Sequence, residues 1–226
     1  MALILHLETA TTVCSVALAL NGDLLSFQEL DSGFTHAENL HGFIQSVLED
    51  AGVGIKQLEA VAVSKGPGSY TGLRIGVSAA KGLGYALGIP VIGLDTLQVM
   101  SRRAANVQKE EGIYCPMIDA RRMEVYTAKY GKNLKQLAPV EALIIDLNSL
   151  GKFQGADPVY FFGDGMPKCR ELLRTLPKAA FIDGIAPSAK DMCQLAFTKF
   201  IAREFEDLAY FEPFYLKDFL ITQKRF

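Results

Sequence analysis

The sequence predicts an α/β protein of two lobes, each with a mixed sheet flanked by helices. Apolar segments of strand length alternate with segments of helical periodicity along the 226 residues. A pattern of apolar strand, acidic residue, polar turn and second strand also occurs twice, around Glu8 and around Asp119. The composition, 50% hydrophobic and 21% charged, is sufficient for a packed core.

The chain opens with three predicted strands. Residues 3–8 and 12–20 are mostly apolar, and residues 24–30 follow as a third strand. The second and third strands are separated by Asn21 and Gly22. This pair strongly favours a two-residue hairpin, because a type I′ turn needs positive φ at both central residues. The opening segment is therefore predicted to be an antiparallel meander.

Helices and strands alternate after the meander. A helix is predicted over residues 35–51, because Thr35 and Glu38 form a capping box and apolar residues recur at helical spacing as far as Gly52. The elements that follow are a strand at 58–65, a helix at 71–87, a strand at 90–95 and a helix at 96–108. This order matches half of an actin-like ATPase, or a ribonuclease H-like sheet, better than a Rossmann unit, in which strand and helix alternate from the start.

The second half repeats the opening in degenerate form. Residues 113–130 read as a strand ending in an acid, a short turn and another strand. A further strand, a glycine turn and a helix are predicted next, followed by a late helix within residues 187–207. The domain boundary is placed in the polar stretch 106–112. This gives a first lobe of residues 1–105 and a second of 106–226, whose C-terminal segment is expected to pack back on the first lobe.

A loop rich in glycine has the layout of a phosphate-binding loop, but it fits neither standard template. Gly66 and Gly68 occupy the first two places of G-x-G-x-x-G, whereas Thr71 stands where the third glycine belongs. No register of this stretch supplies the Gly-Lys pair of a Walker loop. A generic anion bound to the free N–H groups at the start of the next helix remains an alternative.

Small residues recur at every fourth position of the helix that follows this loop. They share one face of the helix and comprise Gly72, Gly76, Ala80, Gly84 and Gly88. Each glycine costs about 1 kcal/mol relative to alanine inside a helix, so the repeat indicates close approach of another backbone. Packing on the protein's own sheet and a seam for a second helix both remain open. A polar face, expected to meet water or a partner, comprises Arg74, Ser78, Lys81 and Tyr85.

The turn after the first strand carries Glu8, Thr9 and Thr11. In actin-like ATPases the equivalent turn holds an aspartate and hydroxyl groups around phosphate and magnesium. A polar hairpin tip is the alternative interpretation, because a glutamate is one methylene longer and would move the carboxylate. Asp119 takes the corresponding place in the second half, where a simple hairpin charge is again the alternative.

The sequence offers no metal-binding or nucleophilic constellation, and no catalytic residue is assigned. His36 and His41 lie about 140° apart on a helix, so they cannot bind one metal from the same face. The four cysteines form no C-x-x-C pair, which indicates reduced thiols in a cytosolic protein.

Charge and hydropathy also limit the function. The formal net charge of -2 gives no overall attraction to nucleic acid, although basic residues outnumber acidic ones between Arg102 and Lys135. The apolar N-terminal stretch lacks a basic n-region and is interrupted by Glu8, so no signal peptide is predicted. No apolar run reaches the roughly 18 to 20 residues of a membrane span, so no membrane contact is expected.

Six segments spread over nearly the whole chain carry a resemblance to a known family. They read, in order, LETATTVCSVAL, GPGSYTGLRIG, IGLDTLQVM, IDARRMEVYTAKY, FFGDG and EPFYLKDF. In this order they resemble the bacterial TsaB (YeaZ) family, a subunit of the machinery that makes threonylcarbamoyladenosine in tRNA. GPGSYTGLRIG is the most specific of the six. The resemblance implies a two-lobed actin-like (ASKHA, ribonuclease H-like) fold and a cytoplasmic protein.

The resemblance also implies a function and partners. The family member is a non-catalytic scaffold that pairs with a TsaD-type catalytic subunit, joined by a TsaE-type ATPase. Together they form N6-threonylcarbamoyladenosine at position 37 of tRNAs that read A-starting codons. The isolated chain is expected to hold no cofactor and no metal, to bind ATP or ADP only in the complex, and to meet tRNA indirectly. A homodimer is an alternative when the chain is alone.

Site residues are implied in the same way. Family members associate through their first-lobe helices, and the corresponding partner-binding residues here are His36, Leu40, Ile44, Val47, Gly72, Arg74, Gly76, Ala80 and Gly84. A vestigial nucleotide loop comprises Glu8, Thr9, Thr11 and Asp119, with Glu8 in place of the family's usual aspartate. The alternatives are a metallopeptidase-like or ATPase enzyme of the actin-like superfamily, and a self-associating actin-like protein of unrelated role.

Overall fold

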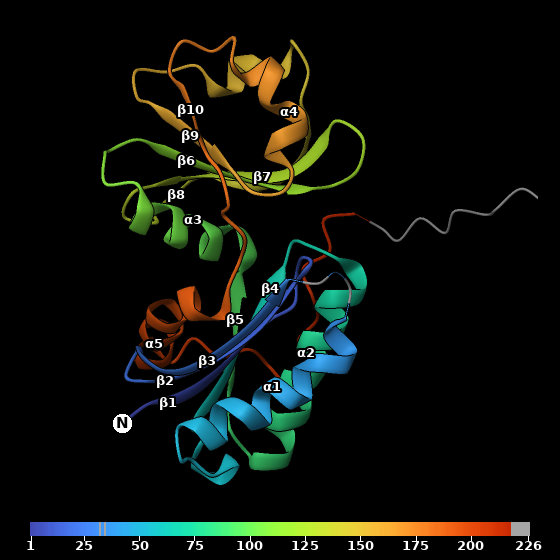
Figure 1. Ribbon diagram of the computed structural model, residues 1–226, viewed down its shortest axis with the longest axis vertical. Coiled ribbons are helices and arrows are strands. Elements are labelled where there is room, and N and C mark those ends of the chain that lie inside the picture. The colour runs from blue at the N-terminus through green and yellow to red at the C-terminus, as the bar shows by residue number, and fades with distance from the viewer. Residues whose placement is uncertain (32, 34, 218–226) are drawn as a thin grey trace, which may run out of the picture.

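The computed structural model describes residues 1–31, 33 and 35–217. The chain folds into two lobes, each built on a five-stranded mixed sheet (Figure 1). The first lobe lies below the second in Figure 1, and helix α3 (Thr96–Val107) lies between the two sheets. The predicted two-lobed α/β fold of the actin-like type is confirmed.

The first sheet has the strand order β3-β2-β1-β4-β5. Its first three strands form the predicted antiparallel meander, and β4 and β5 run parallel to β1. The strands are β1 (Leu3–Glu8), β2 (Val13–Leu20), β3 (Asp23–Asp31), β4 (Ala60–Gly66) and β5 (Val91–Asp95). The β2–β3 turn has φ values of 53° at Asn21 and 87° at Gly22, the left-handed conformation that the Asn-Gly pair predicts.

Two helices cover one face of this sheet, α1 (His36–Asp50) and α2 (Tyr70–Leu87). Their inner side chains share one apolar core with β1, β2 and β4. The predicted capping box of α1 is wrong, because the Thr35 side chain accepts no capping hydrogen bond from the first turn. The Asn39 side-chain amide instead donates to the Thr35 carbonyl oxygen at 2.9 Å. The short 3₁₀ helix η1 (Ile55–Gln57) leads into β4.

The opposite face of the first sheet is covered by the end of the chain. The 3₁₀ helix η3 (Ala189–Met192) and α5 (Cys193–Ala202) bury apolar side chains against β1, β2, β4 and β5. Helix α5 is shorter than the late helix predicted within residues 187–207, since it ends at Arg203 in the left-handed conformation with φ of 57°. Figure 1 shows the chain descending from the second lobe to reach this position.

The second sheet repeats the topology of the first, with strand order β10-β9-β6-β7-β8. Strands β6, β7 and β8 are antiparallel, whereas β9 runs parallel to β6 and β10 runs parallel to β9. The elements of this lobe are β6 (Ile113–Asp119), β7 (Glu124–Gly131), β8 (Gln136–Ile144), η2 (Ser149–Phe153), β9 (Val159–Phe162), α4 (Met166–Leu173) and β10 (Ala179–Ile182). The internal repeat therefore extends from a sequence pattern to the order of the strands.

A buried carboxylate joins the two lobes. The Asp95 side chain accepts hydrogen bonds from the backbone N–H groups of Leu97 at 2.8 Å and Gln98 at 3.1 Å, which caps α3. The same oxygen accepts from the Tyr130 hydroxyl of β7 at 3.2 Å. Desolvation raises the pKa of Asp95.

The C-terminal strap, residues 203–217, crosses the first lobe after α5. Phe211 is buried in the same first-lobe core to which α1 and α2 contribute. The backbone N–H of Glu206 donates to the Val91 carbonyl oxygen at 2.9 Å, and that of Phe214 donates to the Lys65 carbonyl oxygen at 2.6 Å. The predicted boundary at 106–112 covers the last two residues of α3 and the loop that leads to β6. The last nine residues of the predicted second lobe, 218–226, lie outside the described residues.

Candidate functional site

The turn between β1 and β2 is closed around the Glu8 side chain. This carboxyl group is fully buried and accepts hydrogen bonds from the Ala10 backbone N–H at 2.7 Å and from the Ser64 hydroxyl. Desolvation outweighs these hydrogen bonds and raises the pKa of Glu8 to about 7. Both carboxyl oxygens are therefore engaged by the protein's own groups.

The glycine-rich loop closes on the same turn. The Ser69 N–H donates to the Ala10 carbonyl oxygen at 2.7 Å, and the Ser69 hydroxyl caps α2 by accepting from the Gly72 N–H at 3.3 Å. A Cβ atom on Gly68 would lie closer than 3.0 Å to the Ala10 carbonyl oxygen. The N–H groups of Ser69 and Gly72 at the start of α2, where an anion would bind, are thus engaged by the chain itself.

The other residues predicted for the nucleotide loop have structural partners. The Thr9 hydroxyl donates to the Gly72 carbonyl oxygen at 2.8 Å, and the Thr11 hydroxyl accepts from the Val13 N–H at 3.4 Å. Asp119 lies in the second lobe, where its carboxylate accepts from the Lys168 ammonium at 2.6 Å. The structure therefore gathers Glu8, Thr9 and Thr11 around one turn, and ties Asp119 to α4.

The glycines of FFGDG also serve packing. Gly163 has φ of 102°, and a Cβ there would lie closer than 3.0 Å to the carbonyl oxygen of Met117 and to the side chain of Met100 in α3. A Cβ on Gly165 would meet Ile118 and Val125 within the same limit. This turn lets β9 and α4 approach β6 closely, which favours the turn over a nucleotide contact.

Most residues predicted to bind a partner are buried inside the first lobe, so the residue assignment needs correction. Leu40, Ile44, Val47 and Ala80 belong to its apolar core, and His36 is buried with its Nε2 atom 2.7 Å from the Thr11 carbonyl oxygen. These side chains face the sheet because the apolar positions of an amphipathic helix pack on the nearest core.

The small-residue face of α2 packs on the protein's own sheet. A Cβ on Gly72 would lie closer than 3.0 Å to the Thr9 carbonyl oxygen, and one on Gly76 would come equally close to the Thr9 hydroxyl oxygen. A Cβ on Gly84 would meet Val91 closer than 3.0 Å. These buried glycines therefore do not present a surface to a second protein. Of the predicted partner-binding set, Arg74 is exposed.

The polar face of α2 is partly covered by the C-terminal strap. The Lys81 ammonium donates to the Phe211 carbonyl oxygen at 2.9 Å. The Arg74 Nε atom donates to the Tyr215 hydroxyl at 3.2 Å, and its guanidinium lies 4.2 Å from the centre of the Tyr70 ring. This face therefore serves as a seat for the chain's own C-terminal segment.

A half-buried apolar row on α1 and α2 is the feature that the sequence reasoning missed. Phe43 on α1 and Ile75, Ala79 and Leu83 on α2 pack against the first-lobe core while remaining partly exposed. The α2 members repeat at four-residue spacing one position before the small-residue face, so the same periodicity could have found them. Their neighbours on the solvent side of α1 are polar and include Glu38, His41, Gln45 and Glu49.

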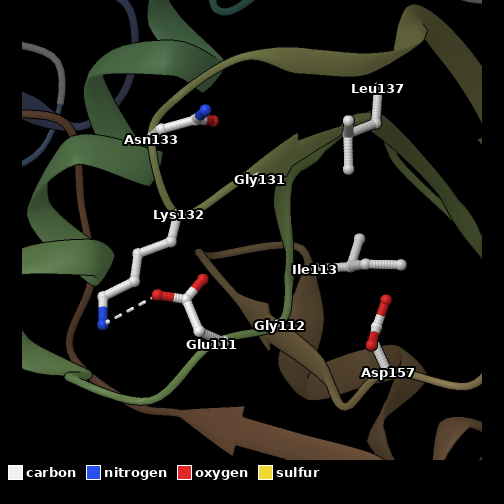
Figure 2. Close-up of a pocket in the computed structure, with 8 residues that line it drawn as sticks. All are labelled: Glu111, Gly112, Ile113, Gly131, Lys132, Asn133, Leu137 and Asp157. Atoms are coloured by element: carbon white, nitrogen blue, oxygen red, sulfur yellow. Dashed lines mark ion pairs between the residues drawn. The ribbon is translucent and has the colours of Figure 1, made fainter.

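A shallow cavity of about 520 Å³ lies in the second lobe, away from these elements. Figure 2 shows Lys132 and Glu111 as an ion pair on one side, 3.4 Å apart, with Ile113, Leu137 and Asp157 on the other. Its lining residues come from the start of β6, the β7–β8 turn and the loop before β9.

Metal ligands are not grouped in the part of the chain that the structure describes, where no three His, Cys, Asp or Glu side chains come close enough to share an ion. Within the same residues, none of the helices is both long enough and apolar enough to cross a membrane.

The fold and this site define a two-lobed actin-like protein whose β1–β2 turn is closed around its own buried carboxyl group. Residues 32–218 match the family model described as TsaD, tRNA N6-adenosine threonylcarbamoyltransferase. A curated relative from Bacillus subtilis, "tRNA threonylcarbamoyladenosine biosynthesis protein TsaB", is 31% identical over 199 residues, which covers 86% of this chain and 85% of the relative. The chain belongs to the TsaB (YeaZ) family.

Further comparisons agree with this assignment. The TsaB proteins of Haemophilus influenzae and Escherichia coli are 37% and 36% identical over 54% and 58% of this chain. The matched segments span about half of these two relatives, 51% and 55% of their lengths. The solved structure of YeaZ from Pseudomonas aeruginosa superposes with a TM-score of 0.82 at 27% identity, covering 96% of this chain and 100% of that structure.

Proposed function

We propose that this protein is a subunit of the machinery that forms N6-threonylcarbamoyladenosine in tRNA, and that it acts as a scaffold for a TsaD-type catalytic subunit. The observation that carries the scaffold role is the filled first-lobe loop. Glu8 is buried and hydrogen-bonded to Ser64 and to the Ala10 N–H, and the start of α2 presses on the same turn. Such a loop offers no cradle for a phosphate group or a metal ion.

The partner docks on the half-buried apolar row of α1 and α2. Phe43, Ile75, Ala79 and Leu83 supply apolar side chains that are partly accessible, and exposed residues of α1 include polar ones such as His41 and Gln45. An apolar centre with a polar rim is the usual anatomy of a specific protein interface. The expectation that first-lobe helices bind the partner is kept, with these residues in place of the buried ones.

The remaining roles follow from the scaffold. A TsaE-type ATPase joins the pair, ATP or ADP binds only in the assembled complex, and tRNA is modified by the catalytic subunit. The isolated chain performs no catalysis and works in the cytoplasm. When alone it pairs with a second copy through the same apolar row, because the row would otherwise stay exposed.

The test is a modification assay with unmodified tRNA, the TsaD-type and TsaE-type proteins of the same organism and a source of activated threonylcarbamoyl. Modified nucleoside should form when this chain is added and should be nearly absent without it. The chain should also co-purify with the TsaD-type subunit. Equal product with and without the chain would refute the scaffold role. Turnover of ATP or peptide by the chain alone, lost on Glu8→Ala, would favour the enzyme alternative.

A further inference from the structure

The turn between β6 and β7 has a backbone conformation that its residues do not favour. Arg121 and Arg122 have φ values of 73° and 49°, in the left-handed region that residues with a Cβ atom rarely adopt. The β2–β3 turn of the first lobe also places two successive residues there, Asn21 and Gly22. Asparagine and glycine adopt this left-handed region with less strain than arginine does. The arginines are thus not required by the turn, which points to a use for their side chains.

Both arginine side chains are exposed and available. Within residues 1–31, 33 and 35–217, neither guanidinium makes a hydrogen bond or an ion pair. The two nearest acids in the chain are already engaged by lysines. Asp119 pairs with Lys168 at 2.6 Å, and Glu124 pairs with Lys217 of the C-terminal strap. The arginines are therefore not neutralised by the acids that flank them.

The ion pair between Glu124 and Lys217 connects the turn to aromatic groups of the first lobe. Two residues before Lys217, the Tyr215 ring lies 4.8 Å from the Tyr70 ring, and the Tyr215 hydroxyl accepts from Arg74. Arg74 is exposed and also lies over the Tyr70 ring. The strap thus links the arginine turn of the second lobe to a tilted tyrosine pair and to a third arginine on α2.

We propose that Arg121 and Arg122 bind the phosphate backbone of tRNA directly, with Arg74 and Tyr215 as the adjoining part of the same surface. The inference rests on the proposed function and makes this subunit part of the tRNA-binding surface of the complex. Guanidinium groups bind phosphate oxygens in a bidentate manner, and tyrosine rings stack on unpaired bases. The combination of unpaired arginines and neighbouring aromatic rings favours RNA over an acidic protein.

The decisive variant replaces the pair with the residues that take positive φ in the β2–β3 turn, Arg121→Asn with Arg122→Gly. This change suits the turn, so the variant should melt at or above the temperature of the parent. It should still co-purify with the TsaD-type subunit. The affinity of that complex for an unmodified tRNA transcript should fall by about tenfold, because two charge-assisted contacts are lost. The slope of log affinity against log salt should become shallower by about 1 to 2.

A matched control removes two exposed lysines elsewhere, with Lys109→Gln and Lys135→Gln in one chain. Its tRNA affinity should stay within about twofold of the parent, because the two lysines lie outside the proposed surface. It changes the net charge by the same amount as the arginine variant, so it controls for charge alone. Parent-like tRNA affinity and salt slope in the Asn-Gly variant would overturn the inference. Loss of pairing with the TsaD-type subunit would assign the turn to a protein interface and would also overturn it.

The two proposals fail in different ways. If the parent chain neither pairs with the TsaD-type subunit nor supports modification, the proposed function is wrong. In that case, binding of the tRNA transcript to the parent and variant chains alone tests the arginines. If the parent pairs with the TsaD-type subunit and supports modification, but the arginine variant binds tRNA as tightly as the parent does, the proposed function is supported. The proposed tRNA contact by the arginines is then wrong.

Discussion

Replacing Gly76 with alanine should destabilise the protein, whereas the same replacement at Gly82, on the same helix, should stabilise it. Both glycines lie inside α2, so alanine gains about 1 kcal/mol of helix propensity at either position. Gly82 is exposed, and a Cβ there would meet nothing within 4 Å. A Cβ on Gly76 would lie closer than 3.0 Å to the Thr9 hydroxyl oxygen and 3.4 Å from Val63.

The cost at Gly76 follows from what Thr9 would have to do. Its hydroxyl is buried and donates to the Gly72 carbonyl oxygen at 2.8 Å. Rotating it away leaves a buried polar group unpaired, at about 1 to 3 kcal/mol, and keeping it in place overpacks the contact at a similar cost. Against the gain of about 1 kcal/mol in helix propensity, the net loss is up to about 2 kcal/mol.

Thermal and urea unfolding of the two variants and the parent measure this difference. For a chain of this size, 1 kcal/mol shifts the melting temperature by about 2 to 4 °C, so Gly76→Ala should melt lower than the parent by up to about 8 °C. Gly82→Ala should melt about 2 to 4 °C higher. If Gly76→Ala were as stabilising as Gly82→Ala, the small-residue face would not be packed on the β1–β2 turn as described, and the argument would fail.

Three further predictions concern the same lobe. Folding raises the pKa of Glu8 from 4.5 to about 7, so its contribution favours the folded state below pH 4.5 and is lost as the pH rises through 7. The variant Glu8→Gln should therefore show a flatter pH dependence of the free energy of unfolding than the parent, measured at about pH 5 and about pH 8; identical profiles would contradict this. Ile75→Asp should weaken pairing with the TsaD-type subunit more than tenfold in a pull-down titration, because it puts a charge on the apolar row. The control Leu147→Asp changes an exposed apolar residue of the second lobe and should leave this pairing unchanged. Ser69→Ala should lower the free energy of unfolding by about 1 kcal/mol through loss of the α2 cap, and an unchanged urea midpoint would argue against that cap.

Much of the fold was predictable because local chemistry and the final structure agree. The Asn21-Gly22 pair sets a left-handed turn whatever surrounds it, and this turn fixed the first meander. Apolar periodicity located α2 over nearly the residues that the structure gives. The capping box of α1 failed because Thr35 and Glu38 satisfy the pattern without the required geometry at the first turn.

The candidate site was less predictable, because periodicity shows which residues share a face and not what covers it. The small-residue face of α2 and its polar face both suggested a partner. The first is covered by the β1–β2 turn through Gly72 and Gly76, and the second by the C-terminal strap through Lys81. Both coverings come from segments far away in the sequence, so no local pattern could reveal them.

The two copies of the repeated strand-turn-strand unit share a topology but differ in what their acidic residue contacts. In the first copy the acid is Glu8, whose longer side chain reaches Ser64 and is buried, which closes the turn. In the second copy Asp119 stays at the surface and pairs with Lys168. The first turn is thereby committed to holding α2 in place, and the second keeps its tip free. Only the second tip carries arginines, so the proposed contact with tRNA phosphate should centre on the second lobe, with Arg74 of the first lobe beside it, even though the proposed partner surface lies on the first.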